Sequence, residues 1–459
     1  MVGIALVALY VGYSQLTSPW LTVEQKQLKT VESTLGNEAS PGLLQRAEMW
    51  FKEDPWVKNA NARFGDNSRF MYFQNHELFN DDRSIKVDPI AMLWQNDKSD
   101  TPYTLTARSA QLDATTKFKL DSNEFGAISS GQLHGDVRIT GPDGLRIEGR
   151  TFSISDNALK ITTSQPVKFS WGPHSGIAQS GAEIDVLSSG PDDQRGLMSI
   201  TDVQRIRLLG RVDCDLLFQG DVASNEAVKL KISAANGFEF FIPTHEATFF
   251  GFADRELKKD NQIMIERPTI SGGLDRLFCS KLTLQFQPAV VESEEPKKRT
   301  TKLQLASIQA EGSKVIFTSR EQNVTAIMSR LKYHIEERVM ELSGSVVAAT
   351  GRPKPVQIYQ STSMLTASHV LAVHDKDNQI HTIQCIGPGQ IEPSDLPSAE
   401  RRSESDVTFF AKWSESLLMR QVPEQKVTLK GTVVVSQSNA TDMIATDDAG
   451  AGMSLSGDV

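Results

Sequence analysis

The chain is poor in cysteine, has no excess of basic residues and shows only one sizeable apolar run. Its 459 residues include three cysteines, Cys214, Cys279 and Cys385. They are too few and too scattered for a disulfide framework, and they lack the paired spacing of a zinc site. We expect buried apolar thiols, although one bridge stays open. The net charge of -9 argues against a general nucleic-acid binder, which needs clustered Lys and Arg on one face.

Catalytic motifs are missing as well. Ser175 stands in a Gly-x-x-Ser-Gly turn between two expected strands, whereas a nucleophile elbow needs Gly-x-Ser-x-Gly between a strand and a helix. Phosphate-binding loops, the HExxH motif and the dinucleotide fingerprint do not occur. Of the densest histidine set, His369 and His374 have an odd offset that places them on opposite faces of a strand. We therefore expect no enzyme, no metal site and no cofactor.

The apolar run lies at the beginning of the sequence. Residues 2–13 are apolar and uncharged, which is short for a membrane span of about 20 residues. Tyr10, Tyr13 and Trp20 are the residue types found at a membrane interface. We expect residues 1–21 to form an uncleaved anchor, with a signal peptide or a buried segment as alternatives. The first two would place the body of the protein outside the cytoplasm.

What the sequence does contain is a repeat of the pattern Leu-x-Gly-x-Val. Four copies have their glycines at Gly135, Gly210, Gly344 and Gly431. Each copy stands among residues that alternate between apolar and polar, which is typical of strands with one buried face. Gly141 to Gly144 read Gly-Pro-Asp-Gly, the best hairpin signal in the chain. The repeat therefore predicts a recurrent turning point in an extended all-β protein made of short antiparallel strands.

Other signals divide the chain. Residues 22–60 are predicted to form a stalk and one short amphipathic helix, which starts at Pro41, carries Leu43, Ala47 and Trp50 on one stripe, and packs on the first β-domain. The β-regions are expected at 61–190, 191–290 and 303–459, the last of which can continue beyond the given end. Residues 291–302 are charged and are predicted to be a linker.

A family resemblance rests on the order of several short motifs. Between residues 107 and 186 these are Leu-His-Gly-Asp-Val-Arg-Ile, Leu-Arg-Ile-Glu-Gly, Ser-Gln-Pro-Val-Lys-Phe and Ser-Gly-Ala-Glu-Ile-Asp-Val. This segment resembles the periplasmic domain of LptC. The third region resembles LptA/OstA repeats through Met-Glu-Leu-Ser-Gly-Ser-Val-Val from Met340 and Val-Thr-Leu-Lys-Gly-Thr-Val-Val from Val427. Both belong to the lipopolysaccharide export proteins.

The resemblance implies a fold and a function. The fold would be a tandem β-jellyroll, an antiparallel sheet folded over on itself, behind an N-terminal membrane helix. The function would be to bind lipopolysaccharide or a similar envelope lipid in an apolar groove and relay it across the periplasm. The partners would be the lipid, an inner-membrane ABC transporter and other β-jellyroll domains stacked edge to edge, and the chain would be a single-span inner-membrane protein with its body in the periplasm.

Groove candidates come from the clearest alternating stretch. Their side chains would face inward, where they could shield alkyl chains from water at about 0.8 kcal/mol per buried CH2. They are Val137, Ile139, Ile147, Phe152, Ile154, Ile161, Val167 and Phe169. Ordinary core packing explains the same pattern. The alternative function is therefore a structural or adhesive envelope protein with a filled core, and an envelope hydrolase is the weakest possibility.

Overall fold

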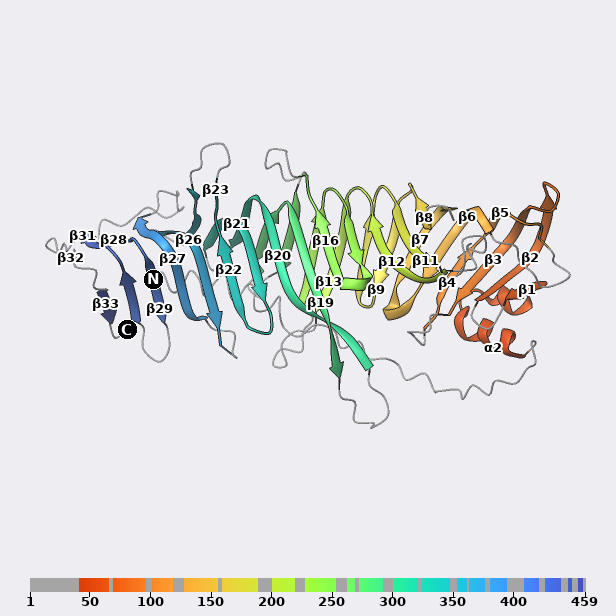
Figure 1. Cartoon of the computed structure of the whole chain (residues 1–459), viewed down its shortest axis with the longest axis horizontal. Helices are drawn as coiled ribbons and strands as arrows, with labels where there is room; N and C mark the ends of the chain where they lie inside the picture. Colours follow the sequence, from red (N-terminus) through yellow and green to blue (C-terminus); the bar gives the residue numbers. More distant parts are fainter. Residues whose placement is uncertain are drawn as a thin grey trace. The chain divides into compact units, whose positions relative to one another are not determined.

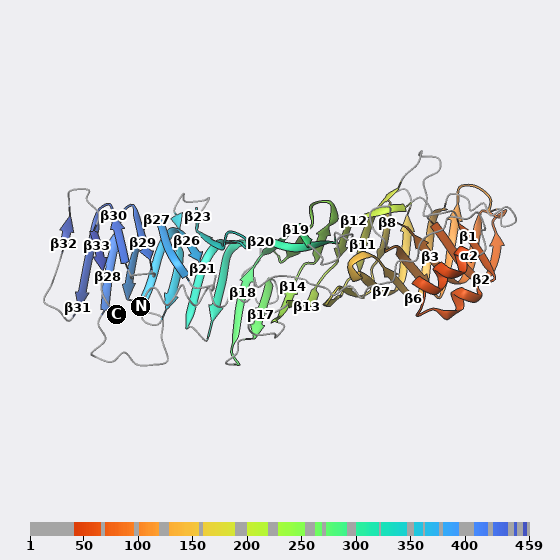
Figure 2. The same cartoon turned by 90° about the horizontal axis from the view of Figure 1, so that it is seen from below.

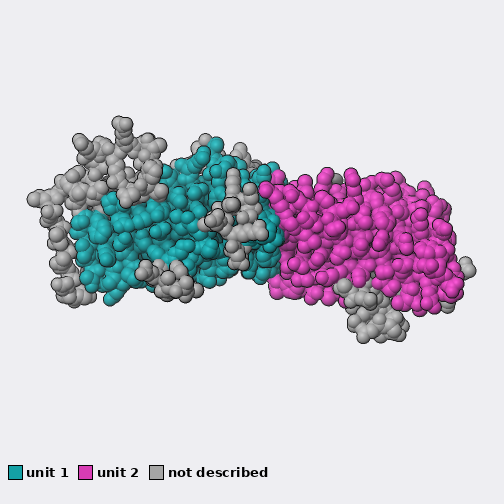
Figure 3. All heavy atoms as spheres, turned by 90° about the horizontal axis from the view of Figure 1, so that it is seen from above, with its two compact units in different colours: residues 1–22, 216–236, 245–459 teal, residues 23–215, 237–244 magenta. Residues whose placement is uncertain are grey.

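The computed structural model describes residues 41–456, apart from short gaps, and shows an all-β, antiparallel architecture, as predicted. The gaps are 66–68, 96–100, 119–127, 156–158, 189–199, 219–227, 253–261, 269–271, 292–299, 321–322, 347–352, 361–362, 376–379, 394–407, 421–425, 439–444 and 448–452. The strands group into two compact units (Figure 3). Unit 2 holds residues 23–215 and 237–244, and unit 1 holds 1–22, 216–236 and 245–459.

The predicted short helix is present in unit 2. Helix α2 (Pro41–Trp50) is followed by the short helix η1 (Pro55–Asn59). Ala47, Phe51 and Val57 are buried against Phe70 and Tyr72, and both views place α2 beside β2 (Figures 1 and 2). Ala47, Phe51 and Val57 are thereby removed from contact with water. The helix is therefore held in place mainly by apolar packing.

The predicted anchor, residues 1–21, lies outside the described residues. Within the part of the chain that is described, no helix combines the length and the apolar character needed to span a membrane. Most of the predicted charged linker, 292–299, also lies outside the described residues. Its last three residues, Thr300, Thr301 and Lys302, belong to a strand that pairs with Ala289, Val290 and Val291.

The strands of unit 2 form two layers, which we call A and B. Several long strands pair with one neighbour in their first part and with a different neighbour in their second part. For example, residues 146–148 of β7 pair with β9, whereas residues 153–155 pair with β8. The strands of unit 2 are β1 (Ala62–Gly65), β2 (Arg69–Phe79), β3 (Ser84–Trp94), β4 (Tyr103–Ala107), β5 (Ser109–Ala114), β6 (Ile128–Thr140), β7 (Arg146–Ser155), β8 (Lys160–Thr163), β9 (Val167–Trp171), β10 (His174–Ala178), β11 (Ala182–Ser188), β12 (Ile200–Leu208), the first part of β13 (Val212–Phe218) and β15 (Phe238–Phe241).

Layer A of unit 2 contains β1, β4, β9, β10 and β13, together with residues 69–73 of β2, 90–94 of β3, 137–140 of β6 and 146–149 of β7. Layer B contains β5, β8, β11, β12 and β15, together with residues 75–79, 84–87, 128–134 and 151–155 of the same long strands. Four strands thus cross from one layer to the other, and the sheet is folded over along that crossing line.

Unit 1 repeats this plan with its own layers. Its strands are β14 (Val228–Ala234), β16 (Glu246–Phe250), β17 (Ile263–Pro268), β18 (Leu274–Cys279), β19 (Lys281–Val291), β20 (Thr300–Ser319), β21 (Val324–His334), β22 (Val339–Ser343), β25 (Val356–Gln360), β26 (Ser363–His374), β27 (Ile380–Pro393), β28 (Thr408–Trp413), β29 (Ser416–Arg420), β30 (Lys426–Lys430), β31 (Val433–Ser438), β32 (Ala445–Asp447) and β33 (Met453–Ser456), with a separate pair β23 (Ser345–Val346) and β24 (Pro353–Lys354).

Pairing again assigns each part of a strand in unit 1 to a layer. Layer A contains β14, β17, β18, β25, β28, β31 and β32 with residues 315–319, 324–328, 363–367 and 389–393 of the long strands. Layer B contains β16, β19, β22, β29, β30 and β33 with residues 300–311, 330–334, 369–374 and 380–386. The long strands β20, β21, β26 and β27 cross between the two.

The repeated glycines lie at this crossing line. In three copies of Leu-x-Gly-x-Val the leucine is buried in layer B and the valine in layer A, as with Leu133 and Val137. The glycine between them has a positive φ, which is +88° at Gly135, +68° at Gly210 and +88° at Gly431. An offset of four keeps leucine and valine on one face, and the fold turns that face inward in both layers. The predicted turning point is therefore the corner of a folded sheet.

Candidate functional site: an apolar interior with a buried ion pair

All eight groove candidates lie on β6, β7, β8 and β9 in unit 2. Seven of them are buried, and Phe169 is half-buried. In layer A, Ile139 is the register partner of Ile147, which in turn is opposite Phe169. In layer B, Ile154 stands opposite Ile161. The alternation in the sequence therefore places them on the inner face of the folded sheet.

Aromatic contacts between the layers of unit 2 lie close to these side chains. The ring of Phe169 in layer A stacks on Phe238 in layer B with centroids 6.4 Å apart, and Trp171 meets Phe240 at 5.0 Å. Gly176 is what admits the Phe169 ring, because a Cβ there would stand 2.5 Å from its Cζ. Seven of the eight groove candidates are thus buried in unit 2, and Phe169 contacts the opposite layer.

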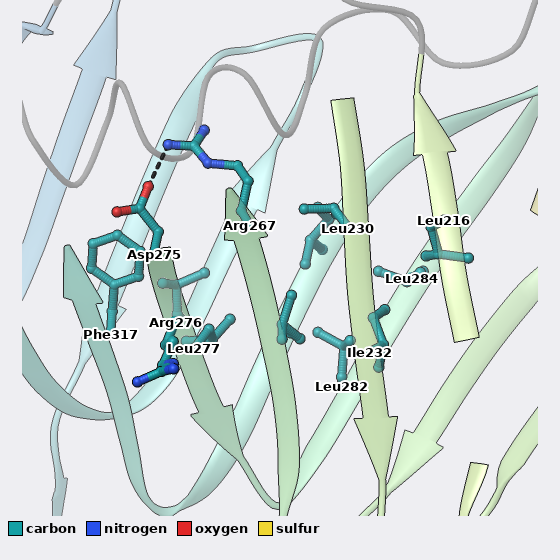
Figure 4. A pocket seen from close by; sticks show the side chains of 13 residues that line it. Leu216, Leu230, Ile232, Arg267, Asp275, Arg276, Leu277, Leu282, Leu284 and Phe317 are labelled. Atoms are coloured by element: carbon teal, nitrogen blue, oxygen red, sulfur yellow. Dashed lines mark hydrogen bonds and ion pairs between the residues drawn. The ribbon is translucent and has the colours of Figure 1, made fainter. Parts of the chain in front are cut away.

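Unit 1 contains a cavity between its layers. Its volume is about 40 Å³, which is room for about three waters at roughly 10 to 15 Å³ each. Layer A contributes Ile232, Ile265 and Leu277, and layer B contributes Leu282 and Leu284 (Figure 4). These residues are buried and form rows across the strands, since Ile232 is opposite Ile265 and Ile265 is opposite Leu277. The remaining lining residues are Leu216, Leu230, Arg267, Asp275, Arg276, Ile308, Phe317 and Leu331.

One wall of this cavity carries a buried ion pair. Arg267 on β17 and Asp275 on β18 are register partners, their side chains are each 4% exposed, and the guanidinium Nη2 donates to Asp275 Oδ2 (Figure 4). Both follow the inward alternation, because Arg267 comes two residues after Ile265 and Asp275 comes two residues before Leu277. A buried ion pair adds little stability over well-packed apolar residues, since both charges must be desolvated.

Two polar atoms at this ion pair have no hydrogen-bond partner among the described residues. One is the second carboxylate oxygen of Asp275, Oδ1, and the other is Oγ of the neighbouring Ser319. Ser319 is 3% exposed and is the register partner of Asp275 on the neighbouring strand β20. Buried polar atoms left unpaired cost about 1–3 kcal/mol each. The inner face of layer A therefore changes from apolar to polar along the row Arg267, Asp275 and Ser319.

Sequence reasoning missed this polar row. The signal that could have found it is parity, since Ile263, Ile265 and Arg267 share one face of β17. A charged residue one position before the end of a strand is usually exposed, so it attracts no notice in a sequence. Of the phenylalanines between residues 238 and 250, Phe249 is buried whereas Phe238 and Phe240 are half-buried.

Burial favours the neutral form of four other titratable groups. Burial raises the pKa of the Cys385 thiol to about 12 and also raises that of Cys279. The three cysteines are free and buried, as the sequence predicted. Burial also lowers the pKa of His174 to about 4 and that of His374 to about 4. None of these groups lies within the cavity lining of unit 1.

No protein-family model matches the chain, and a search of curated proteins finds no relative. The function is accordingly inferred from the residues and their geometry.

Proposed function

We propose that the chain binds the alkyl chains of an envelope lipid, such as lipopolysaccharide, between the two layers of its folded sheet. The lipid would be received from an inner-membrane ABC transporter and relayed across the periplasm, as the resemblance to LptC and OstA-like β-jellyrolls implies. The proposal is supported chiefly by the apolar cavity between the layers of unit 1. No chemical step is needed, because transfer exchanges one apolar environment for another.

The driving force is adequate for a chain of moderate length. Burial of eight CH2 groups removes them from water at about 0.8 kcal/mol each, or roughly 6 kcal/mol. The cavity of about 40 Å³ accepts only part of such a chain. The layers would therefore move apart along the side opposite the glycine corners, and the free energy of alkyl-chain burial would offset the weaker packing between the layers there.

A structural β-repeat protein is the second candidate. The aromatic contacts between the layers of unit 2, Phe169 on Phe238 and Trp171 on Phe240, favour it. In that case the folded sheet would serve as a stable scaffold for binding other proteins or glycans. The two candidates differ in whether an alkyl chain enters the interior.

The proposal is tested by measuring the binding of n-octanol to the full chain by calorimetry. Leu284→Phe places a larger side chain in the cavity and should weaken octanol binding about tenfold. Thr283→Phe is the matched control, because Thr283 is the neighbour of Leu284 on β19 and has the opposite parity. Octanol binding should be unchanged in this variant. Absence of octanol binding to the unmodified chain would reject the lipid proposal in favour of the structural one.

A further inference from the structure

We propose that Asp275 and Ser319 bind the hydroxyl group of an amphiphile whose alkyl chain occupies the cavity of unit 1. This inference rests on the proposed function and names the chemical class of its cargo. The ligand class is a lipid that presents a hydroxyl group next to its alkyl chain, such as a hydroxyl of a sugar or a glycerol. The two unpaired polar atoms and the apolar lining carry the proposal together.

The arrangement matches the two ends of such a molecule. Leu282, Leu284 and Ile232 form the apolar part of the cavity, and Figure 4 shows the ion pair at one end of this lining. The row Arg267, Asp275 and Ser319 crosses three adjacent strands one inward position beyond the row Ile265, Leu277 and Phe317. An alkyl chain lying along the apolar rows would bring its headgroup to this polar row.

Hydrogen-bond chemistry selects a hydroxyl group. Asp275 Oδ2 already accepts from Arg267, whereas Oδ1 is an acceptor that lacks a donor among the described residues. A ligand hydroxyl could donate to Oδ1 and accept from the Ser319 hydroxyl, whose oxygen is also unpaired within the described chain. The ion pair stays intact in this arrangement.

The same geometry disfavours a fatty acid. A carboxylate has no proton to donate, and it would approach the Asp275 carboxylate in a site where both groups are largely removed from water. Breaking the ion pair to release Arg267 would leave Asp275 as an unpaired buried charge, which is strongly destabilising. A carboxylate headgroup should therefore bind more weakly than a hydroxyl.

Three probes of similar size measure the preference on the full chain. They are n-octanol, its isostere 1-methoxyheptane, which cannot donate a hydrogen bond, and octanoate. Only octanol can donate a hydrogen bond to the buried Asp275 carboxylate, so it should bind about tenfold more tightly than 1-methoxyheptane. Octanoate should bind most weakly.

Two variants locate the effect. Ser319→Ala removes one partner, and Arg267→Met with Asp275→Leu replaces the ion pair by apolar residues, a change that proteins usually tolerate. Both should reduce the preference for octanol over 1-methoxyheptane. The matched control is Glu183→Leu with Arg207→Met, which removes a register-paired ion pair of unit 2, with its atoms 3.0 Å apart, and should leave the preference unchanged.

The outcomes separate the two proposals. Equal binding of octanol and 1-methoxyheptane, unchanged in the variants, would overturn the hydroxyl site while leaving chain binding in place. Tighter binding of octanoate than of octanol would also overturn it. Failure of both uncharged probes to bind would reject the proposed function itself.

Discussion

At the scale of single residues, the corner glycines set the fold. Gly135 has a φ of +88°, and a Cβ there would lie 2.5 Å from the Cβ of Arg108. Any other residue at this position would have an unfavourable left-handed backbone conformation. Its Cβ would also clash with the Cβ of Arg108, which cannot move away because it is attached directly to the backbone. The close approach of Arg108, between β4 and β5, to the corner at Gly135 therefore requires glycine.

Gly135→Ala should destabilise the chain by clearly more than Gly272→Ala does. Gly272 has a φ of +80° but no atom within 4 Å of a built Cβ, so alanine there meets only the backbone penalty of about 1–2 kcal/mol. Urea unfolding of both variants measures the difference. Equal losses of stability would show that the crowding at the corner does not contribute.

Buried histidines predict a dependence of stability on pH. His174 and His374 have a pKa of about 4 in the folded chain because burial disfavours the imidazolium, whereas the ordinary value is 6.5. The unfolded state therefore binds more protons between these values. Stability is full above pH 6.5 and falls as the pH drops toward 4.

Each histidine should lower the free energy of unfolding by about 2 kcal/mol between pH 7 and pH 5. Denaturant unfolding of the His174→Gln and His374→Gln variants at both pH values measures this loss, and each variant should lose about that much of the pH dependence. The exposed His381 supplies the control, because His381→Gln should leave the dependence unchanged. An undiminished pH dependence in both buried-site variants would contradict the assignment.

At the scale of elements, the segment α2–η1 is an apolar cap on the outer face of β2 and β3. Glu53 and Asp54, which lie between the two helices, pair with Arg138 on β6, and Glu53 also pairs with Arg146 on β7. The hydrogen bond from Arg146 is the main reason why the pKa of Glu53 is lowered. These groups are partly exposed, so packing of Phe51 at 3% exposure should dominate the docking.

Phe51→Ala should therefore release this segment from the sheet. Truncation of a buried phenylalanine costs about 3–5 kcal/mol. Hydrogen exchange should speed up in α2 and η1 while the strands β17 and β18 of unit 1 keep their protection. Lys52→Ala, at an exposed neighbouring position, should change nothing. Unaltered exchange of α2 in the Phe51 variant would show that the ion pairs hold the segment.

Sequence patterns predicted where strands and helices lie better than they predicted which strands pair with each other. Alternation identified the strands, Pro41 and the stripe through Ala47 identified α2, and Leu-x-Gly-x-Val identified the corners. Alternation reports which face is apolar but not which of two neighbours a strand selects. The change of partner within β7 between residues 148 and 153 therefore has no counterpart in the pattern.

At the scale of the whole molecule, each unit repeats one device, a sheet folded at glycine corners around an apolar interior. The polar row of Arg267, Asp275 and Ser319 was not predicted, because a sequence does not reveal which strand ends remain covered in three dimensions. The alternation of apolar and polar residues also does not predict whether the interior is filled or hollow. Leucines in a packed core and leucines that line a groove show the same alternation.

The most direct measurement is site-specific photo-crosslinking in cells, with a photoreactive side chain placed at Leu284 in one variant and at Thr283 in another. The two positions are adjacent on β19, and Leu284 lines the cavity whereas Thr283 faces the other way. We predict lipid adducts at Leu284 and none at Thr283. Lipid adducts at neither position in correctly folded protein, or protein adducts alone, would contradict the claim that an alkyl chain enters the folded sheet.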